Sequence, residues 1–172
     1  PVLKKEGLGL KSWMKWPETT AVLKALRSIG SESLFVGGCV RDSFLNKSVT
    51  DIDIATSSKP LVTIKLLKSA SIKAIATGIS HGTITAICGN KKFEITTLRQ
   101  DVETYGRKAK VRFTSDWEAD ALRRDFSLNA IYSNEQGEIF DPFFGLGDLM
   151  NARVRFIGNP EARIKEDFLR KI

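Results

Sequence analysis

Two acidic residues, Asp51 and Asp53, alternate with isoleucines in the segment Thr50-Asp51-Ile52-Asp53-Ile54. Successive side chains of a β-strand point to opposite faces, so in a strand both carboxylates share one face while the isoleucines face a core. Their Cα atoms then lie about 6.6 Å apart, which lets both carboxylates converge on bound cations. Mg²⁺ prefers oxygen ligands and takes the remainder from water and substrate phosphates. The segment therefore predicts a strand that presents a face for divalent metal.

A pair of glycines, Gly37 and Gly38, lies upstream of that strand, between the apolar segment Leu34-Phe35-Val36 and a predicted short helix. Glycine allows close approach of the backbone to a ligand, and the amides at a helix start favour an anion such as phosphate. We expect Arg41, one helical turn further on, to reach a phosphate oxygen, although a surface ion pair with Asp42 or Glu32 is the plainer alternative. A glycine pair alone usually forms a turn, but the two segments in this order predict a site for metal and a nucleoside triphosphate.

These segments resemble the signature of the nucleotidyltransferase superfamily that includes DNA polymerase β. Within it they are similar to the class II CCA-adding tRNA nucleotidyltransferases and the bacterial poly(A) polymerases. Three later segments resemble further motifs of this family and follow in the family's order. They are Arg123-Arg124-Asp125-Phe126-Ser127-Leu128-Asn129-Ala130, then Asp141-Pro142-Phe143-Phe144-Gly145 with Asp148-Leu149, and finally Glu166-Asp167-Phe168-Leu169-Arg170. The matches span residues 34–170, which is nearly the whole chain.

The resemblance implies a template-independent RNA nucleotidyltransferase that adds C and A to tRNA 3′ ends from CTP and ATP. Its reaction would use two Mg²⁺ ions roughly 3.5–4 Å apart, held by Asp51 and Asp53. A bacterial poly(A) polymerase, or an enzyme that adds only part of CCA, stays open as an alternative. A third alternative is a non-catalytic RNA-binding domain that kept the fold.

The superfamily generally adds a third acid from a neighbouring strand, and Glu94 in Phe93-Glu94-Ile95-Thr96 is the best-placed candidate. A solvated strand glutamate is an equally weighted alternative. By resemblance, Arg123 and Asp125 contact the ribose or the triphosphate, and Asn129 supports them. On a continuous helix, Arg123 and Arg124 would diverge and do different jobs.

Asp167 and Arg170 are implied by the resemblance to select the base. They are three residues apart, so they are neighbours on one helix face, where a guanidinium and a carboxylate together complement the edge of a cytosine or an adenine. An ordinary ion pair on a solvated helix is the alternative. The chain departs from the family in Tyr105-Gly106-Arg107-Lys108, where relatives often have Asp-Gly-Arg-His, and at Phe144, where a second glycine is frequent.

Composition sets limits on these interpretations. The 172 residues are 42% hydrophobic and suffice for one domain, alone or with a fragment of another, and the net charge of +7 suits an acidic polymer such as RNA. No apolar run is long enough for a membrane span. Cys39 and Cys88 are predicted to be reduced core thiols, and the single histidine, His81, excludes a histidine-cluster metal site. We expect a cytoplasmic protein, or a mitochondrial one if the source is eukaryotic, and the oligomeric state stays open.

The predicted fold class is α+β, a mixed and mostly antiparallel sheet with helices on one side. Residues 1–158 would form the nucleotidyltransferase head. Residues 159–172 would begin an all-α neck, since the apolar stripe of the last helix is still running where the chain ends. We expect an N-terminal fragment that is weakly active or inactive alone. The predicted helices are 17–29, 40–45, 60–69, 116–129 and one from Pro160. The predicted strands are 33–36, 50–55, 83–88, 92–98, 131–133, 138–140 and 154–157. Residues 99–115 are predicted to be a flexible basic loop with some strand at 110–113.

Overall fold

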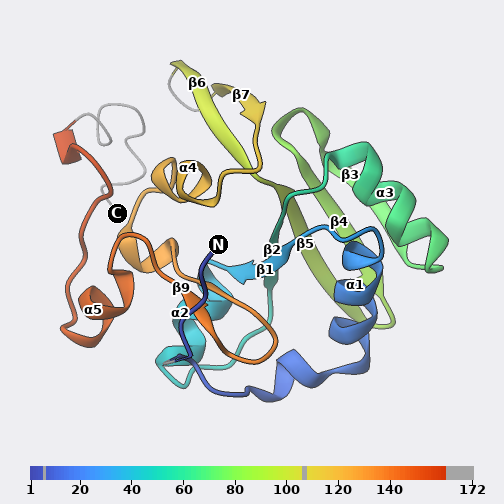
Figure 1. The fold of residues 1–172 in the computed structure, drawn as a ribbon, viewed down its shortest axis with the longest axis horizontal. Helices are drawn as coiled ribbons and strands as arrows, with labels where there is room; N and C mark the ends of the chain where they lie inside the picture. Colours follow the sequence, from blue (N-terminus) through green and yellow to red (C-terminus); the bar gives the residue numbers. More distant parts are fainter. Residues whose placement is uncertain (6, 106–107, 162–172) are drawn as a thin grey trace.

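A computed structural model describes residues 1–5, 7–105 and 108–161. Its main feature is a seven-stranded sheet with the strand order β3-β4-β5-β2-β1-β8-β9 (Figure 1). Strands β2 and β5 pair in parallel, and the other neighbours pair antiparallel. The mixed, mostly antiparallel sheet predicted from the sequence is confirmed. The strands are β1 (Ser33–Val36), β2 (Ile52–Thr56), β3 (Lys73–Gly78), β4 (Thr83–Cys88), β5 (Lys91–Thr97), β8 (Tyr132–Ser133) and β9 (Ile139–Phe140).

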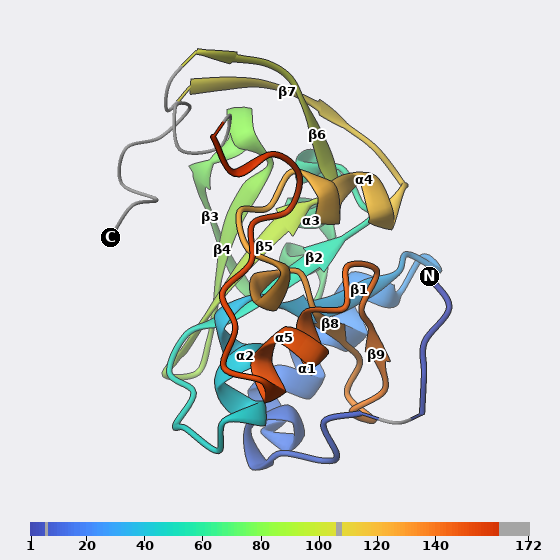
Figure 2. The same ribbon diagram turned by 90° about the vertical axis from the view of Figure 1, so that its left-hand side faces the viewer.

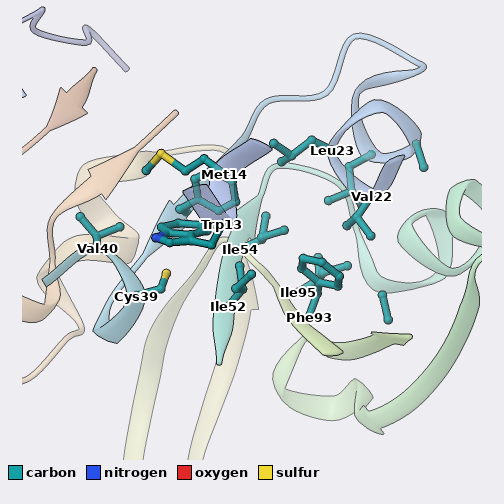
Figure 3. Packing of buried hydrophobic residues seen from close by; sticks show 14 of the residues in the cluster. Trp13, Met14, Val22, Leu23, Cys39, Val40, Ile52, Ile54, Phe93 and Ile95 are labelled. Carbon is teal, nitrogen blue, oxygen red and sulfur yellow. The ribbon is translucent and has the colours of Figure 1, made fainter. Parts of the chain in front are cut away.

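Helices α1 (Pro17–Arg27), α2 (Gly38–Phe44) and α3 (Pro60–Ser69), with the 3-10 turn η1 (Ser12–Lys15), pack on one face of this sheet. Figure 3 shows side chains of this core, in which alternate residues of the two central strands take part. Ile52 and Ile54 of β2 and Phe93 and Ile95 of β5 are at most 1% exposed. Because strand side chains alternate, Asp53 and Glu94 point to the opposite face.

A second core lies on that opposite face, at the β1 end of the sheet. It joins Leu34 and Val36 of β1 to Trp117, Ala121 and Tyr132. Trp117 and Ala121 belong to α4 (Trp117–Leu122), so a helix packs on this face too. The sequence predicted helices on one side of the sheet. Strand β1 is consequently buried on both sides. This second core supports the side of the sheet that carries Asp53.

The segment predicted as a flexible basic loop forms a separate two-stranded sheet of β6 (Arg99–Tyr105) and β7 (Lys108–Phe113). The hairpin extends away from the main sheet, at the top in Figures 1 and 2. Its base is packed tightly, because a Cβ on Gly82 would lie 2.8 Å from the Phe113 ring. The loop prediction was wrong over most of this segment, since only 110–113 was expected to have strand character.

The predicted helix over 116–129 was also wrong in length. Helix α4 ends at Leu122, and the chain then turns and extends at Phe126 (φ −113°, ψ 144°) before a 3-10 turn, η3 (Ser127–Asn129). Phe126 is extended because it bridges Phe156, and this bridge is all that remains of the strand predicted at 154–157. Strand β3 and helix α5 (Gly145–Met150) were not predicted. Residues 160–161 are helical, as expected, and residues 162–172 lie outside the described part of the chain.

Within the described part of the chain, no helix has both the length and the apolar character that a membrane crossing demands.

Candidate active site

The glycine turn between β1 and α2 lies directly beside an acidic side chain. Gly37 has φ 76° and ψ −134°, a conformation that is favourable for glycine and strained for other residues. A Cβ placed on Gly37 would lie 3.7 Å from Asp53 Oδ2 and 4.0 Å from Arg124 Nη1. Gly38 then begins α2, and the Arg41 amide donates to the Gly37 carbonyl at 3.0 Å. The turn therefore brings bare backbone next to one carboxylate and one guanidinium.

The acidic residues gather where β2 and β5 run side by side. Asp53 of β2 pairs in register with Glu94 of β5, so the two side chains are neighbours on the same face, one strand spacing of about 4.8 Å apart. Asp51 precedes the first residue of β2 and is exposed. Burial raises the pKa of Asp53, and the negative charges of Glu94 and Asp51 raise it further. The positive charge of Arg124 acts in the opposite direction, so Asp53 lies under the influence of two carboxylates and one guanidinium.

Such a set of oxygens fits a divalent cation. Among the residues that the structure describes, no three His, Cys, Asp or Glu side chains are close enough together to hold a metal by themselves. That arrangement suits Mg²⁺, which keeps several waters and takes ligands from substrate phosphates. Lys92 Nζ, 3.0 Å from Glu94 Oε1, partly neutralises the group. Asp51, Asp53 and Glu94 offer oxygen donors of the kind that Mg²⁺ prefers, and their assignment as ligands and third acid stays a prediction.

A chain of polar contacts joins the glycine turn to the Arg123–Ala130 motif. Arg41 Nε donates to Asp42 Oδ1 at 2.8 Å, and Arg41 Nη1 donates to Asn129 Oδ1 at 2.9 Å. Asn129 Nδ2 in turn donates to Asp125 Oδ1 at 3.4 Å, and the same oxygen accepts from the Phe126 amide at 2.7 Å. The structure thus brings together three residues predicted from two distant motifs, Arg41, Asp125 and Asn129. The ion pair with Asp42 is present as well.

The two arginines of the motif do not diverge, contrary to the sequence prediction. Arg123 and Arg124 both reach Asp120, at 2.8 Å and 3.2 Å, because they follow it by three and four residues and such positions lie beside the same side chain on a helix. Arg124, rather than Arg123, is the arginine beside Gly37. Tyr132 Oη also donates to Asp120, at 2.8 Å. Sequence reasoning missed Asp120 and Tyr132, although the spacing of three and four residues between Asp120 and the arginines is a signal for such pairs.

The third motif holds the second one in place. Asp141 accepts from the amides of Gly145 and Leu146, at 2.8 and 2.9 Å, at the start of α5. Asp148 Oδ2 accepts from Ser127 Oγ at 2.6 Å, and a Cβ on Gly145 would lie 2.1 Å from the Ser127 carbonyl oxygen. Helix α5 is therefore pressed against η3. Phe144, which replaces a frequent glycine, has φ 57° in the left-handed region and is 73% exposed.

The remaining predicted residues, Asp167 and Arg170, lie outside the described residues.

Fold and site together define a nucleotidyltransferase-like head, and comparison with known proteins specifies the family. Residues 33–155 match the family model described as the poly(A) polymerase head domain. The chain belongs to this family.

Its relatives include tRNA-tailing enzymes. The chain is 44% identical over 151 residues to the CCA-adding enzyme of Lactobacillus delbrueckii subsp. bulgaricus, covering 87% of this chain and 37% of that protein. It is 46% identical over 140 residues to the human mitochondrial CCA tRNA nucleotidyltransferase 1, covering 81% of this chain and 32% of that protein. The chain thus spans about a third of the length of these relatives.

Solved structures agree with the fold. The Bacillus stearothermophilus CCA-adding enzyme in complex with CTP superposes with a TM-score of 0.79 at 36% identity, covering 90% of this chain and 36% of that one. A tRNA nucleotidyltransferase complexed with a primer tRNA and an incoming ATP analog gives a TM-score of 0.67 at 26% identity, covering 87% of this chain and 42% of that one.

Proposed function

We propose that the complete protein adds C and A to the 3′ ends of tRNA from CTP and ATP, with residues 1–158 as its catalytic head and a helical neck that begins at residue 159. Family membership and the CCA-adding relatives support this proposal. The observation that carries it is the pairing of Asp53 with Glu94 beside the Gly37 turn. Acids next to accessible backbone and an arginine are what a metal-bound triphosphate requires. The proposed compartment is the cytoplasm, or the mitochondrion if the source is eukaryotic.

In this proposal Asp51, Asp53 and Glu94 hold Mg²⁺. Bound there, Mg²⁺ would stabilise charge on the attacking and leaving oxygens of an in-line displacement at the α-phosphate. The chain's own residues bind and orient the substrate. The Gly37–Gly38 turn admits the triphosphate to the backbone, and Arg124 offers positive charge at the same point. Asn129 holds both Arg41 and Asp125 in place for contacts with phosphate and ribose.

Arg123, Asp167 and Arg170 complete the proposed nucleotide site. The resemblance assigns Arg123 to the ribose or the triphosphate, and Asp167 with Arg170 to the Watson–Crick edge of the base. A protein surface of fixed donors and acceptors would then replace a nucleic-acid template.

A nucleotide-omission assay tests the function. The complete protein is incubated with tRNA that lacks its 3′ CCA, with CTP alone, ATP alone or both, and the products are sequenced. CC from CTP alone and CCA from the mixture are expected. The double variant Asp51→Ala with Asp53→Ala should incorporate neither nucleotide, and retained incorporation would remove those residues from the mechanism.

The second candidate is a poly(A) polymerase or an enzyme that adds only part of CCA. The matched family model is described as the poly(A) polymerase head domain, which favours a poly(A) polymerase as this second candidate. The same assay separates the candidates, since a long run of A from ATP alone identifies the poly(A) activity. Absence of any product with wild-type protein, together with absent nucleotide binding by calorimetry, would indicate a non-catalytic RNA-binding domain.

A further inference from the structure

Asp120 is a buried carboxylate in α4 that none of the predicted motifs includes. It is 1% exposed and accepts hydrogen bonds from three parts of the chain. Asp120 Oδ1 accepts from the Arg99 amide at 3.2 Å and from Arg123 Nε at 2.9 Å. Asp120 Oδ2 accepts from Tyr132 Oη at 2.8 Å and from Arg124 Nη2 at 3.2 Å. We call these five residues the Asp120 cluster.

Within the cluster, Arg124 is held at two separate nitrogens. Its Nη2 donates to Asp120, and its Nε donates to the Tyr132 hydroxyl at 3.1 Å. The third nitrogen, Nη1, is the one that lies closest to the position of a Cβ on Gly37. The guanidinium also stacks near the Tyr132 ring, with 5.3 Å between Arg124 Cζ and the ring centroid. A long flexible side chain is thereby fixed with one donor edge facing the glycine turn.

The charge of the cluster indicates a ligand of opposite sign. The guanidinium groups of Arg123 and Arg124 share one carboxylate, that of Asp120, so the cluster carries more positive than negative charge. Burial and the neighbouring Arg123 lower the pKa of Arg99 to about 10, as expected where cations crowd together. The side chains of Arg123 and Arg124 are only 13% and 16% exposed, and both are paired with Asp120. In spite of its burial, the contacts with Tyr132 and Asp120 raise the pKa of Arg124, so its positive charge is held in place beside the glycine turn.

We propose that Asp120 is a positioning residue, which fixes Arg123 and Arg124 so that they meet the triphosphate at the Gly37 turn. This inference rests on the proposed function. A purely structural role would be served as well by an apolar residue, because replacing a buried ion pair by packed apolar side chains is often neutral or stabilising. Removing only the carboxylate instead leaves two nearly buried guanidinium groups without their shared acceptor.

The test uses the complete protein with tRNA that lacks its 3′ end. Steady-state kinetics are measured for Asp120→Asn, Asp120→Glu and Tyr132→Phe, with Glu118→Gln as the control. Glu118 is an exposed acid on the same helix, and its carboxylate lies outside the cluster. Thermal melting and circular dichroism establish that each variant is folded, and active-site titration gives the concentration of active enzyme.

We expect Asp120→Asn to raise the KM for CTP and ATP roughly 10- to 100-fold, the usual size of an effect on a residue that orients a ligand-binding group. The KM for tRNA should stay within about twofold, because the cluster faces the triphosphate. Asp120→Glu, which keeps the charge, should recover part of the loss, and Tyr132→Phe should raise the triphosphate KM several-fold. Glu118→Gln should match the wild type.

An unchanged triphosphate KM for folded Asp120→Asn, with only a smaller active fraction, would overturn the inference. If Asp120→Asn does not fold, Tyr132→Phe decides, and an unchanged triphosphate KM in that variant has the same consequence. Inactive wild-type protein would instead contradict the proposed function. The two failures are thus distinguishable.

Discussion

Replacing Gly37 with alanine should destabilise the protein by about 1–3 kcal/mol, the cost of holding a residue with a side chain in a conformation that glycine alone adopts readily. Gly37 has φ 76° and ψ −134°. The new methyl would meet Asp53 Oδ2 at 3.7 Å and Arg124 Nη1 at 4.0 Å, which are ordinary contacts. Backbone strain therefore sets the magnitude, and steric overlap adds little.

The neighbouring glycine provides a matched control. Gly38 has no positive φ, and a Cβ there would meet only Arg41 Nη2, at 3.7 Å. We expect Gly38→Ala to stay within about 0.5 kcal/mol of the wild type. Each kcal/mol corresponds to roughly 2–4 °C for a chain of this size, so Gly37→Ala should melt about 2–12 °C lower in a thermal unfolding experiment. Equal melting temperatures for the two variants would refute the strain argument.

Three further predictions concern the same region. Because burial, Glu94 and Asp51 raise the pKa of Asp53, its charged form is disfavoured in the folded state, so the stability of the metal-free protein falls as pH rises through that raised pKa. Asp53→Asn should therefore melt at a higher temperature than the wild type in EDTA at neutral pH, and its melting temperature should no longer respond to added Mg²⁺; a lower melting temperature in EDTA would contradict this. Phe144→Gly should raise the free energy of unfolding, measured by urea unfolding, by about 0.5–1 kcal/mol. The strain energy relieved at the left-handed backbone of residue 144 is larger than the free energy that the more flexible unfolded chain gains. Cys39 is buried and burial raises its pKa to about 12, so a thiol reagent at pH 8 should label the native protein at Cys88 before Cys39, as peptide mapping would show.

The acidic strand and the glycine turn were predictable because both depend on neighbours in sequence. Alternation of acids with Ile52 and Ile54 places the side chains once a strand forms, and only glycine suits the backbone at residue 37. Glu94 could be named as a candidate, but its place beside Asp53 depends on the parallel register of β2 with β5, which joins segments about 40 residues apart. Sequence periodicity contains no information about that register.

The end of α4 was not predictable from local preference. Residues 123–130 include the helix formers Arg123, Arg124, Leu128 and Ala130 beside weaker ones. Phe126 is extended because it pairs with Phe156, and the Asp125 carboxylate accepts from the Phe126 amide. Tertiary contacts override helix propensity here. Both arginines reach Asp120, which also accepts a hydrogen bond from Tyr132, a residue of the second core. The spacing between these residues was visible in the sequence, but their convergence was not.

We propose that the sheet face that carries Asp53 and Glu94, beside the Gly37 turn, is the catalytic centre. Incorporation of labelled CTP into tRNA lacking its 3′ end, compared between wild-type complete protein and folded Asp53→Asn at saturating Mg²⁺, tests it most directly. Loss of a carboxylate that holds Mg²⁺ should remove several kcal/mol of transition-state stabilisation, so the rate should fall about a thousandfold or more, while Glu118→Gln stays near the wild type. Incorporation by Asp53→Asn within tenfold of the wild-type rate would contradict the account.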